Sequence, residues 1–462
     1  MSRRLRLAGV LGVLVVELAV VLWASGVGRI ASRDPIRIGA VFPLAGDAAS
    51  LADQQLRGVR IAADLVNADG GVAGRSIELD VRDLRSQADA PAAVASLKSA
   101  GVVAVIGAYA SDLSVAASEA ANAAGLVYWE AGAVADRLTA RGLPLVFRVG
   151  ASGANLGASS STFAVSELAP RLARSASTLR VAVVAADDDY ARSVADAAVS
   201  TATFLGAPVV SRTTYDLGHP DWTRVMHALQ ASAPDVVMLA SHIPDGIEFR
   251  RAMVDAGVHV GALIGTTMAQ CDPDFAGELG PAAVGVFASD RPTGGFEPAA
   301  LTPNARALYD RLAAAWVADA TEQASSPSTD EDEASEYGAP TDSGSEYRIS
   351  GPVEAGTPAA GPTEEGLSGF TAAWVLFHDV LPAAIGSGSL STDSIAAAAR
   401  ALDLPIGALP NGAGVRFSND APTLGQNERA AAVIWQWQAI RSYTFVWPPS
   451  YATGRISFVP LP

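Results

Sequence analysis

The stretch that most constrains the fold is residues 36–74, IRIGAVFPLAGDAASLADQQLRGVRIAADLVNADGGVAG. An apolar run, Ile36–Phe42, stops at Pro43, and a loop of small residues follows. Apolar residues then recur at helical spacing until the turn at 69–71. This order predicts a strand, an open loop and a helix, the first unit of a parallel α/β sheet. Because ligands of such sheets bind at the carboxyl ends of the strands, the loop at 45–51 is a candidate site.

The same alternation continues along the chain. The wholly apolar run at 102–107 is typical of a buried parallel strand. GVVAVIGAYAS (101–111) and PDVVMLASHI (234–243) share a pattern of buried strand, small-residue loop and helix, which indicates two similarly built lobes. Strands are predicted at 76–81, 102–107, 126–129, 145–149, 180–185, 208–215, 235–240 and 262–265, and helices at 89–100, 113–124, 156–174, 191–204, 222–231 and 245–256.

Length and composition fit a large two-lobed protein. The 462 residues exceed one ordinary domain, and 50% of them are hydrophobic. Cys271 is the single cysteine, so a disulfide within the chain and a cysteine-based metal site are excluded. Five scattered histidines show no metal-binding spacing, and no basic face suggests a nucleic-acid partner. We expect no metal and no cofactor.

Much of the net charge of −16 lies in one segment. Residues 321–366 hold eleven carboxylates and one base, Arg348, and are rich in Ser, Thr, Pro and Gly. Such a stretch buries too little apolar surface to offset its ordering entropy. It is predicted to be a disordered acidic insertion between helices at 305–320 and 367–384. A solvated linker explains it, and a docking tail for a basic partner is the alternative.

The N-terminus has the pattern of an export signal. Arg3, Arg4 and Arg6 precede an apolar run at 7–24, which Glu17 interrupts. Residues 1–30 are therefore interpreted as a cleaved signal peptide or as an uncleaved N-terminal membrane anchor. Glu17 would be costly at mid-bilayer and weakens the second interpretation. Both place the body of the protein outside the cytoplasm, at the cell surface or in the periplasmic or extracellular space.

Enzyme signatures are missing from the sequence. It contains no GxSxG elbow, no GxxxxGK[ST] loop and no GxGxxG that opens a helix. The three acids at 187–189 are more typical of a solvated turn and helix N-terminus than of a catalytic dyad. We therefore expect a binding protein, with a hydrolase or lyase as the disfavoured alternative.

The sequence resembles the type I periplasmic binding proteins, specifically the leucine/isoleucine/valine-binding receptors of ABC importers. The resemblance rests on IGAVFPLAGD…RGVRIAADLVNADGGVAGRSIEL, GVVAVIGAYAS, GLVYWEAGAVADRLTARGLPLVFRV and the ending NERAAAVIWQWQ…VWPP. It covers nearly all of residues 36–450 except the acidic insertion. It implies a two-lobed α/β fold, each lobe a mostly parallel sheet flanked by helices, with a cleft and a hinge between them.

The resemblance also implies where a ligand binds. The Ser111 hydroxyl is expected to contact the ligand, and the backbone of Gly132, Ala133 and Val134 to hold its carboxylate and ammonium groups. Tyr190 supplies an aromatic ring from the second lobe. Glu130 is interpreted either as negative charge for a ligand cation or as the partner of an arginine, Arg137 or Arg148. The remaining ligand-binding candidates are Leu51, His242 and Thr267.

Four of these positions depart from the family pattern. Val134 stands where the family often has Thr, and His242 where it often has Tyr. Leu51 replaces an aromatic residue, and Thr267 replaces the Glu that pairs with the ammonium of an amino acid. Loss of that charge-assisted bond removes about 1.5–3 kcal/mol of binding energy. The ligand is therefore expected to be an amino acid or a related compound, possibly branched-chain, with amides, short peptides and aromatic acids left open.

The resulting interpretation is an exported solute-binding protein with two lobes. Lobe 1 is expected to comprise 36–152 and 289–409, and lobe 2 to comprise 153–288 and 414–455, with crossovers near 150, 288 and 411. It would capture a small polar ligand, close on it and deliver it to an ABC permease, as a monomer. The alternative is a membrane-tethered module that senses a ligand on the same fold.

Overall fold

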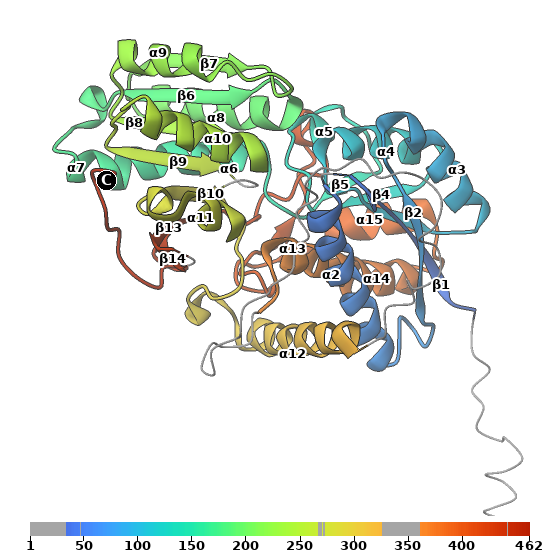
Figure 1. Cartoon of the computed structure of the whole chain (residues 1–462). Coiled ribbons are helices and arrows are strands. Elements are labelled where there is room, and N and C mark those ends of the chain that lie inside the picture. Colours follow the sequence, from blue (N-terminus) through green and yellow to red (C-terminus); the bar gives the residue numbers. More distant parts are fainter. Residues whose placement is uncertain (1–33, 47, 267–269, 271–272, 326–360, 441) are drawn as a thin grey trace, which may run out of the picture.

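The computed structural model describes residues 34–46, 48–266, 270, 273–325, 361–440 and 442–462. Two separate sheets organise these residues, one of five strands and one of seven, and a third pairing joins two short strands, β11 (Asp403–Leu404) and β12 (Val415–Arg416). Figure 1 shows the two sheets side by side, each with its own helices. We call the part built on the five-stranded sheet lobe 1 and the part built on the seven-stranded sheet lobe 2.

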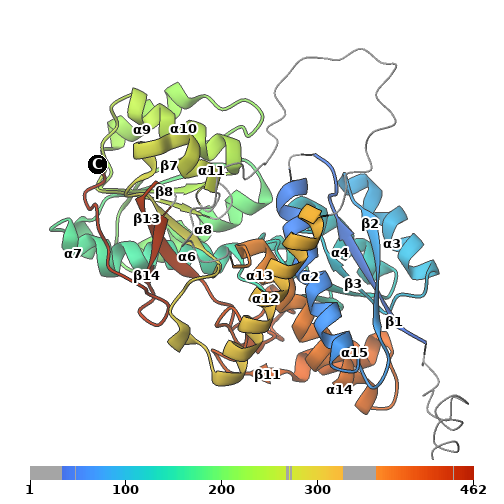
Figure 2. The ribbon, with the colours of Figure 1, turned by 60° about the horizontal axis from the view of Figure 1, so that its bottom comes forward.

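Lobe 1 has a parallel sheet in the order β2-β1-β3-β4-β5. Its strands are β1 (Ile36–Phe42), β2 (Ile77–Asp83), β3 (Ala104–Gly107), β4 (Val127–Glu130) and β5 (Val146–Arg148). Helices from both ends of the chain pack around it (Figure 2). These are α2 (Ala49–Ala68), α3 (Ala90–Ser99), α4 (Ser111–Ala123), α5 (Arg137–Ala140), α12 (Pro303–Ser325), α13 (Glu364–Trp374), α14 (Leu381–Gly386) and α15 (Thr392–Ala401), with a π-helical segment at Val375–Val380 between α13 and α14.

Lobe 2 has the strand order β14-β13-β10-β9-β8-β6-β7, in which the pairs β10–β13 and β13–β14 are antiparallel and the other pairs are parallel. The strands are β6 (Val181–Ala186), β7 (Val209–Tyr215), β8 (Val236–Ala240), β9 (Ala262–Thr266), β10 (Phe287–Asp290), β13 (Val433–Ala439) and β14 (Ser442–Trp447). The helices are α6 (Gly153–Phe163), α7 (Ala169–Arg171), α8 (Asp189–Phe204), α9 (Trp222–Ser232), α10 (Ile243–Asp255) and α11 (Pro273–Leu279).

Glycines allow α2 and α13 to pack closely against each other in lobe 1. A Cβ atom on Gly58 would lie 2.1 Å from the backbone oxygen of Gly366, and one on Gly369 would lie 2.1 Å from that of Gln55. Both distances are far below a van der Waals contact, so larger residues are sterically excluded. This contact joins the first helix of the described residues to one more than 300 residues later, and it fixes one wall of the site described below.

The structure follows the predicted alternation as far as β9 and corrects it in two places. The loop predicted at 45–51 is shorter, because α2 begins at Ala49 and Leu51 lies in its first turn, packed against the core. The insertion predicted at 321–366 has ordered ends, because α12 continues to Ser325 and α13 begins at Glu364. Thr363 caps α13 by accepting from the N–H of Gly366 at 3.1 Å. Residues 326–360 and 1–30 lie outside the described residues.

Within the described part of the chain, one helical stretch, Glu364–Gly386, is long and apolar enough to cross a membrane. Of its most apolar window, 67% is buried inside the protein. That burial is typical of a core helix, and Leu367, Phe370 and Leu376 of this stretch are completely buried against the rest of lobe 1.

Candidate functional site

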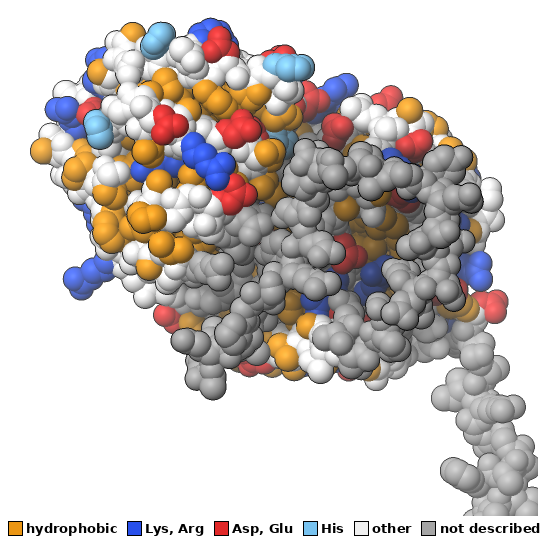
Figure 3. Space-filling model, viewed as in Figure 1, with side chains coloured by type: hydrophobic (Ala, Val, Ile, Leu, Met, Phe, Trp, Pro, Cys, Tyr) orange, Lys and Arg blue, Asp and Glu red, His pale blue; other side chains and the backbone are white. Residues whose placement is uncertain are grey.

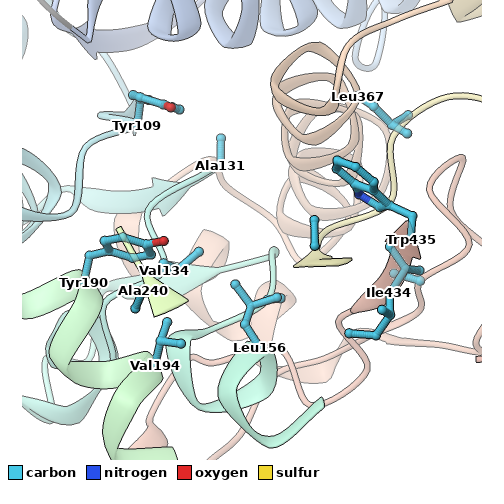
Figure 4. Close-up of a cluster of buried hydrophobic side chains, with 14 of the residues drawn as sticks. Tyr109, Ala131, Val134, Leu156, Tyr190, Val194, Ala240, Leu367, Ile434 and Trp435 are labelled. Carbon is cyan, nitrogen blue, oxygen red and sulfur yellow. The ribbon is translucent and has the colours of Figure 1, made fainter. Parts of the chain in front are cut away.

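The carboxyl ends of strands from both sheets face one another where the lobes meet. Arg137 of lobe 1 and Asp189 of lobe 2 form an ion pair at 2.9 Å, and the N–H of Asp136 donates to the hydroxyl of Ser193 at 3.0 Å. In Figure 4, Tyr109 and Val134 from loops of lobe 1 and Tyr190 from lobe 2 surround one region between the lobes. The three side chains are at most 7% exposed, so the lobes are in contact around this region.

Ser111 begins α4, directly after the loop that follows β3. Its hydroxyl oxygen accepts from the N–H of Ala135 at 3.2 Å, which ties the β3 loop to the β4 loop. A hydroxyl in this position keeps its own hydrogen for another acceptor. Tyr109, two residues earlier, has a φ of +70°, a conformation that a bulky residue adopts only when its surroundings hold it there.

Glu130 is the most unusual group of the site. It ends β4, is completely buried, and its Oε1 accepts from the N–H groups of Gly132 and Ala133, both at 2.8 Å. Its Oε2 accepts from the hydroxyl of Tyr128 at 3.0 Å. Burial raises the pKa of the Glu130 carboxyl, and the hydrogen bonds from Ala133 and Gly132 oppose that rise.

These bonds revise two expectations about the β4 loop. The N–H groups of Gly132 and Ala133, expected to hold a ligand carboxylate, already have an acceptor within the chain. Glu130 pairs with neither of the expected arginines, because Arg137 pairs with Asp189 and the nearest carboxylate to Arg148 is Asp136, at 3.9 Å. The reason is local, since the tight turn after β4 folds its own N–H groups back onto the preceding carboxylate.

Two buried arginines hold the carbonyl groups of the same loop. Arg148 donates to the carbonyls of Ala133 at 3.2 Å and Ala135 at 2.7 Å, and burial lowers its pKa to about 10. Arg291, which directly follows β10 of lobe 2, donates to the carbonyl of Gly132 and pairs with Glu364 of α13. Burial by itself would lower the pKa of Arg291, but the nearby acidic groups, Glu364 first and then Asp290 and Glu365, together outweigh it and raise that pKa.

Tyr190 and His242 form the facing wall in lobe 2. The Tyr190 hydroxyl donates to the carbonyl of Thr266, and its ring lies edge-on to that of His242, with centroids 5.2 Å apart. His242 precedes α10 and pairs through Nε2 with Asp188, which caps α8. Burial alone would lower the pKa of His242, but the hydrogen bond and charge of Asp188 raise it.

Among the described residues, several buried polar atoms around this region have no hydrogen-bond partner. They include Oε1 of Gln55, the hydroxyl of Ser241 and both polar side-chain atoms of Gln270. All three side chains are 0% exposed. Gln55 lies against the β4 loop, since a Cβ on Gly132 would be 2.9 Å from its Oε1. Because buried polar groups are usually paired, these atoms are candidates for ligand contacts.

These additional residues leave little signal in the sequence. Gln55 follows Gln54 in an ordinary amphipathic helix pattern, Gln270 lies in a loop pattern, and Arg291 lies close to the predicted crossover near 288. Of the predicted site residues, Ser111, Glu130, Gly132, Ala133 and Val134 lie on the lobe 1 side and Tyr190 and His242 on the lobe 2 side. Leu51 lies in the first turn of α2, and Thr267 is outside the described residues.

A buried acidic cluster lies beside Arg291 and yields a pH-dependent prediction. Glu365 is 5% exposed, and burial, with the neighbouring Glu364, raises its pKa well above the ordinary value. The folded state therefore binds this proton more tightly than the unfolded state, and stability falls as pH rises above the ordinary pKa of a glutamate. We expect Glu365→Gln to raise the free energy of unfolding at pH 7 and to remove a slope of up to about 1.4 kcal/mol per pH unit.

Urea unfolding between about pH 5 and pH 8, above the ordinary pKa of a glutamate, measures this effect. Glu119→Gln is the matched control, because its side chain is 71% exposed. A Glu365→Gln protein that is less stable than the parent at pH 7 would contradict the prediction.

Within the described residues, no group of three or more His, Cys, Asp or Glu side chains is arranged to hold a metal ion.

In the view of Figure 3, acidic, basic and apolar side chains are interspersed over lobe 2.

Comparisons with known proteins agree on the family. The family model described as "Periplasmic binding protein" matches residues 35–329. The curated Leu/Ile/Val-binding protein homolog 8 of Brucella abortus is 28% identical over 427 residues, which cover 92% of this chain and 93% of the relative. Homolog 7 of Brucella melitensis is 32% identical over 236 residues, or 51% of this chain and 59% of that protein.

Solved structures share the fold. The leucine-binding protein LivK of Thermotoga maritima superposes with a TM-score of 0.64 at 20% identity, covering 89% of this chain and 98% of that one. LivJ of Streptococcus pneumoniae, solved with isoleucine, has a TM-score of 0.64 at 18% identity over 90% and 100% of the two chains. A solute-binding protein of R. palustris, solved with benzoate, has a TM-score of 0.64 at 16% identity over 91% and 98%. These findings confirm the resemblance predicted from the sequence, and the chain belongs to the periplasmic binding protein family, with the type I fold.

Proposed function

We propose that this protein is an extracytoplasmic receptor that captures a small polar ligand between its lobes and delivers it to an ABC importer. The observation that carries the proposal is the meeting of loops from both sheets around buried polar atoms without partners, those of Gln55 from lobe 1 and Ser241 from lobe 2. A group enclosed by two lobes is released only when they separate, so binding and hinge motion are coupled. No catalytic step is assigned to the site.

The division into lobes follows from this mechanism. We infer that the two lobes move as two bodies about crossovers near 150, 288 and 411. The predicted bounds, 36–152 with 289–409 and 153–288 with 414–455, shift in two places. β10 of the seven-stranded sheet ends at Asp290, and Phe417 packs on Trp129 and Phe147 of the five-stranded sheet. The protein is expected to act as a monomer, with an ABC permease as its membrane partner. Its ligand is an amino acid or a related compound. Residues 1–30 are proposed to direct export, and N-terminal sequencing of the exported protein tests whether they are removed.

A thermal-shift screen against amino acids, their amides and small aromatic acids tests ligand capture. X-ray scattering with the best compound then tests closure, because a bound ligand should change the separation of the lobes. A protein that is stabilised by none of these compounds, and whose scattering is the same with and without each of them, would refute the proposal.

We expect Ser111→Ala and Tyr190→Ala each to weaken the best compound from that screen at least tenfold, or about 1.4 kcal/mol. Ser111 supplies a hydroxyl hydrogen and Tyr190 supplies a ring from the opposite lobe, so the two variants report on both walls of the site. Isothermal titration calorimetry measures the two affinities.

Ser99→Ala is the matched control for Ser111, because that exposed hydroxyl donates within its own helix to the carbonyl of Ala95. Tyr190→Phe separates the ring from the hydroxyl that donates to Thr266. Unchanged affinity in both alanine variants would remove this site assignment.

A further inference from the structure

The β4 loop contains an anion-binding turn that the protein itself fills. Two successive N–H groups, those of Gly132 and Ala133, point at one carboxylate oxygen of Glu130 from 2.8 Å. The other oxygen is held by the Tyr128 hydroxyl, and the whole Glu130 side chain is 0% exposed. A ligand carboxylate would need the same two N–H groups. To reach them it would have to displace the buried carboxylate of Glu130, which is part of the chain.

The negative charge of the surrounding loops also disfavours a ligand carboxylate. The loops at 108–112, 130–137, 187–190 and 241–245 carry seven carboxylates and two basic side chains, Arg137 and His242. The buried Arg148 and Arg291 contact the β4 loop as well, so acidic groups still outnumber basic ones. Both basic side chains are already paired, Arg137 with Asp189 and His242 with Asp188. A region between low-dielectric walls with an excess of one charge repels ligands of that charge and attracts the opposite one.

The unpartnered atoms nearby define what the ligand should offer. Oε1 of Gln55 accepts hydrogen bonds only, and it lies against the same β4 loop. In lobe 2, Ser241 directly follows β8, and Gln270 lies in the segment after β9. The Ser241 hydroxyl and the Gln270 side-chain oxygen can also accept. The Ser241 hydroxyl, the Gln270 amide nitrogen and the Ser111 hydroxyl can also donate, so they bind either kind of ligand group. The discriminating atom is Oε1 of Gln55, which an N–H donor satisfies and a carboxylate does not.

From these three observations we propose that Glu130 takes the place of a ligand carboxylate, so that the site selects an organic amine without a free carboxylate rather than an α-amino acid. The inference rests on the proposed function, because it names the ligand class of that same site. It makes Glu130 a specificity-determining residue that need not touch the ligand.

The first test removes the built-in carboxylate. Glu130→Ala leaves the N–H groups of Gly132 and Ala133 without an acceptor, so acetate should raise the melting temperature of this variant and not that of the wild type. L-leucine should bind Glu130→Ala at least tenfold more tightly than it binds the wild type. Glu130→Gln is the matched control, because its amide oxygen still accepts from both N–H groups, so acetate should not raise its melting temperature.

A melting temperature of Glu130→Ala that acetate does not change, or changes as much as that of Glu130→Gln, would overturn the inference. This readout needs neither closure nor transport, so it is separable from the proposed function. A wild type that binds no compound in the screen would refute the proposed function, and the acetate result would still decide the role of Glu130.

The second test uses the wild type and covers the case in which Glu130→Ala does not fold. L-leucinamide and L-leucine share a side chain and an ammonium group, and only L-leucine has a free carboxylate. Calorimetry should give at least tenfold tighter binding of L-leucinamide. Equal affinities, the reverse order or no binding of either probe would overturn the inference for the wild-type protein.

Discussion

Replacing Arg291 by methionine should lower the free energy of unfolding by about 3–5 kcal/mol. Arg291 is 6% exposed, pairs with Glu364 and donates to the carbonyl of Gly132. The substitution leaves the Glu364 carboxylate buried without its cation, beside Glu365. An uncompensated buried charge costs far more than the intact pair contributes, and urea unfolding at pH 7 measures the loss.

The pH dependence of Arg291→Met, together with a control variant, tests whether the unpaired carboxylate causes the loss of stability. Without the arginine, the buried carboxylates bind protons more tightly in the folded state than in the unfolded state, so the deficit should shrink as pH falls from 7 to 5. Arg251→Met removes an ion pair whose side chains are 49% and 52% exposed, and should cost at most about 1 kcal/mol. Equal losses in the two variants would contradict this account.

Arg291→Met combined with Glu364→Met should recover part of the lost stability, because two apolar side chains then replace a buried pair and no charge is left alone. The double variant therefore separates the loss of the cation from the loss of packing. A double variant that is as unstable as Arg291→Met would show that the carbonyl of Gly132, and not Glu364, is the important partner.

Trp129→Ala should lower the free energy of unfolding by about 3–5 kcal/mol. Trp129 lies in β4 and is completely buried, with ring centroids 5.7 Å from Phe147 and 5.3 Å from Phe417. Its Nε1 donates to the carbonyl of Ala372 in α13 at 2.8 Å. The substitution leaves a cavity between the sheet of lobe 1 and the helix that supports the site, and urea unfolding measures the cost.

Two further variants test the cause of that loss. Trp129→Phe keeps a large ring and removes the N–H donor, so it should cost less than half as much as Trp129→Ala. Phe204→Ala removes an aromatic ring that is 88% exposed and should change stability by no more than about 0.5 kcal/mol. A loss of less than about 0.5 kcal/mol for Trp129→Ala would contradict the prediction, because it would mean that neighbouring side chains move into the cavity.

Most elements of the fold were predictable because each leaves a local signal. The apolar run at 102–107 predicted a buried strand, and β3 occupies Ala104–Gly107. Helix ends were less accurate. α2 starts at Ala49, within the stretch of small residues that resembled an open loop, because neighbouring alanines extend a helix readily. Glu364 and Glu365 looked like part of an acidic linker and are instead buried in α13.

The loops that carry the candidate site could be predicted from the sequence, but the hydrogen-bond partners of its residues could not. Ser111, Tyr190 and His242 follow strands of the two sheets, and sequence order places such residues at the carboxyl edges. The acceptors of their hydrogen bonds lie far away in sequence. The Tyr190 hydroxyl reaches Thr266, and Arg291 reaches both Gly132 and Glu364, which no spacing along the chain indicates.

The amino-acid sequence alone determined the alternation of strands and helices, the family and the loops that carry the site, because hydrophobic periodicity and short motifs are local properties of the chain. The tertiary structure decided which polar groups are already satisfied. Glu130 could have faced a ligand, an arginine or its own loop, and these choices differ only in the direction of one side chain in a buried turn. Burial strongly favours paired polar groups, so the packed surroundings selected the arrangement in which Glu130 accepts from Gly132 and Ala133.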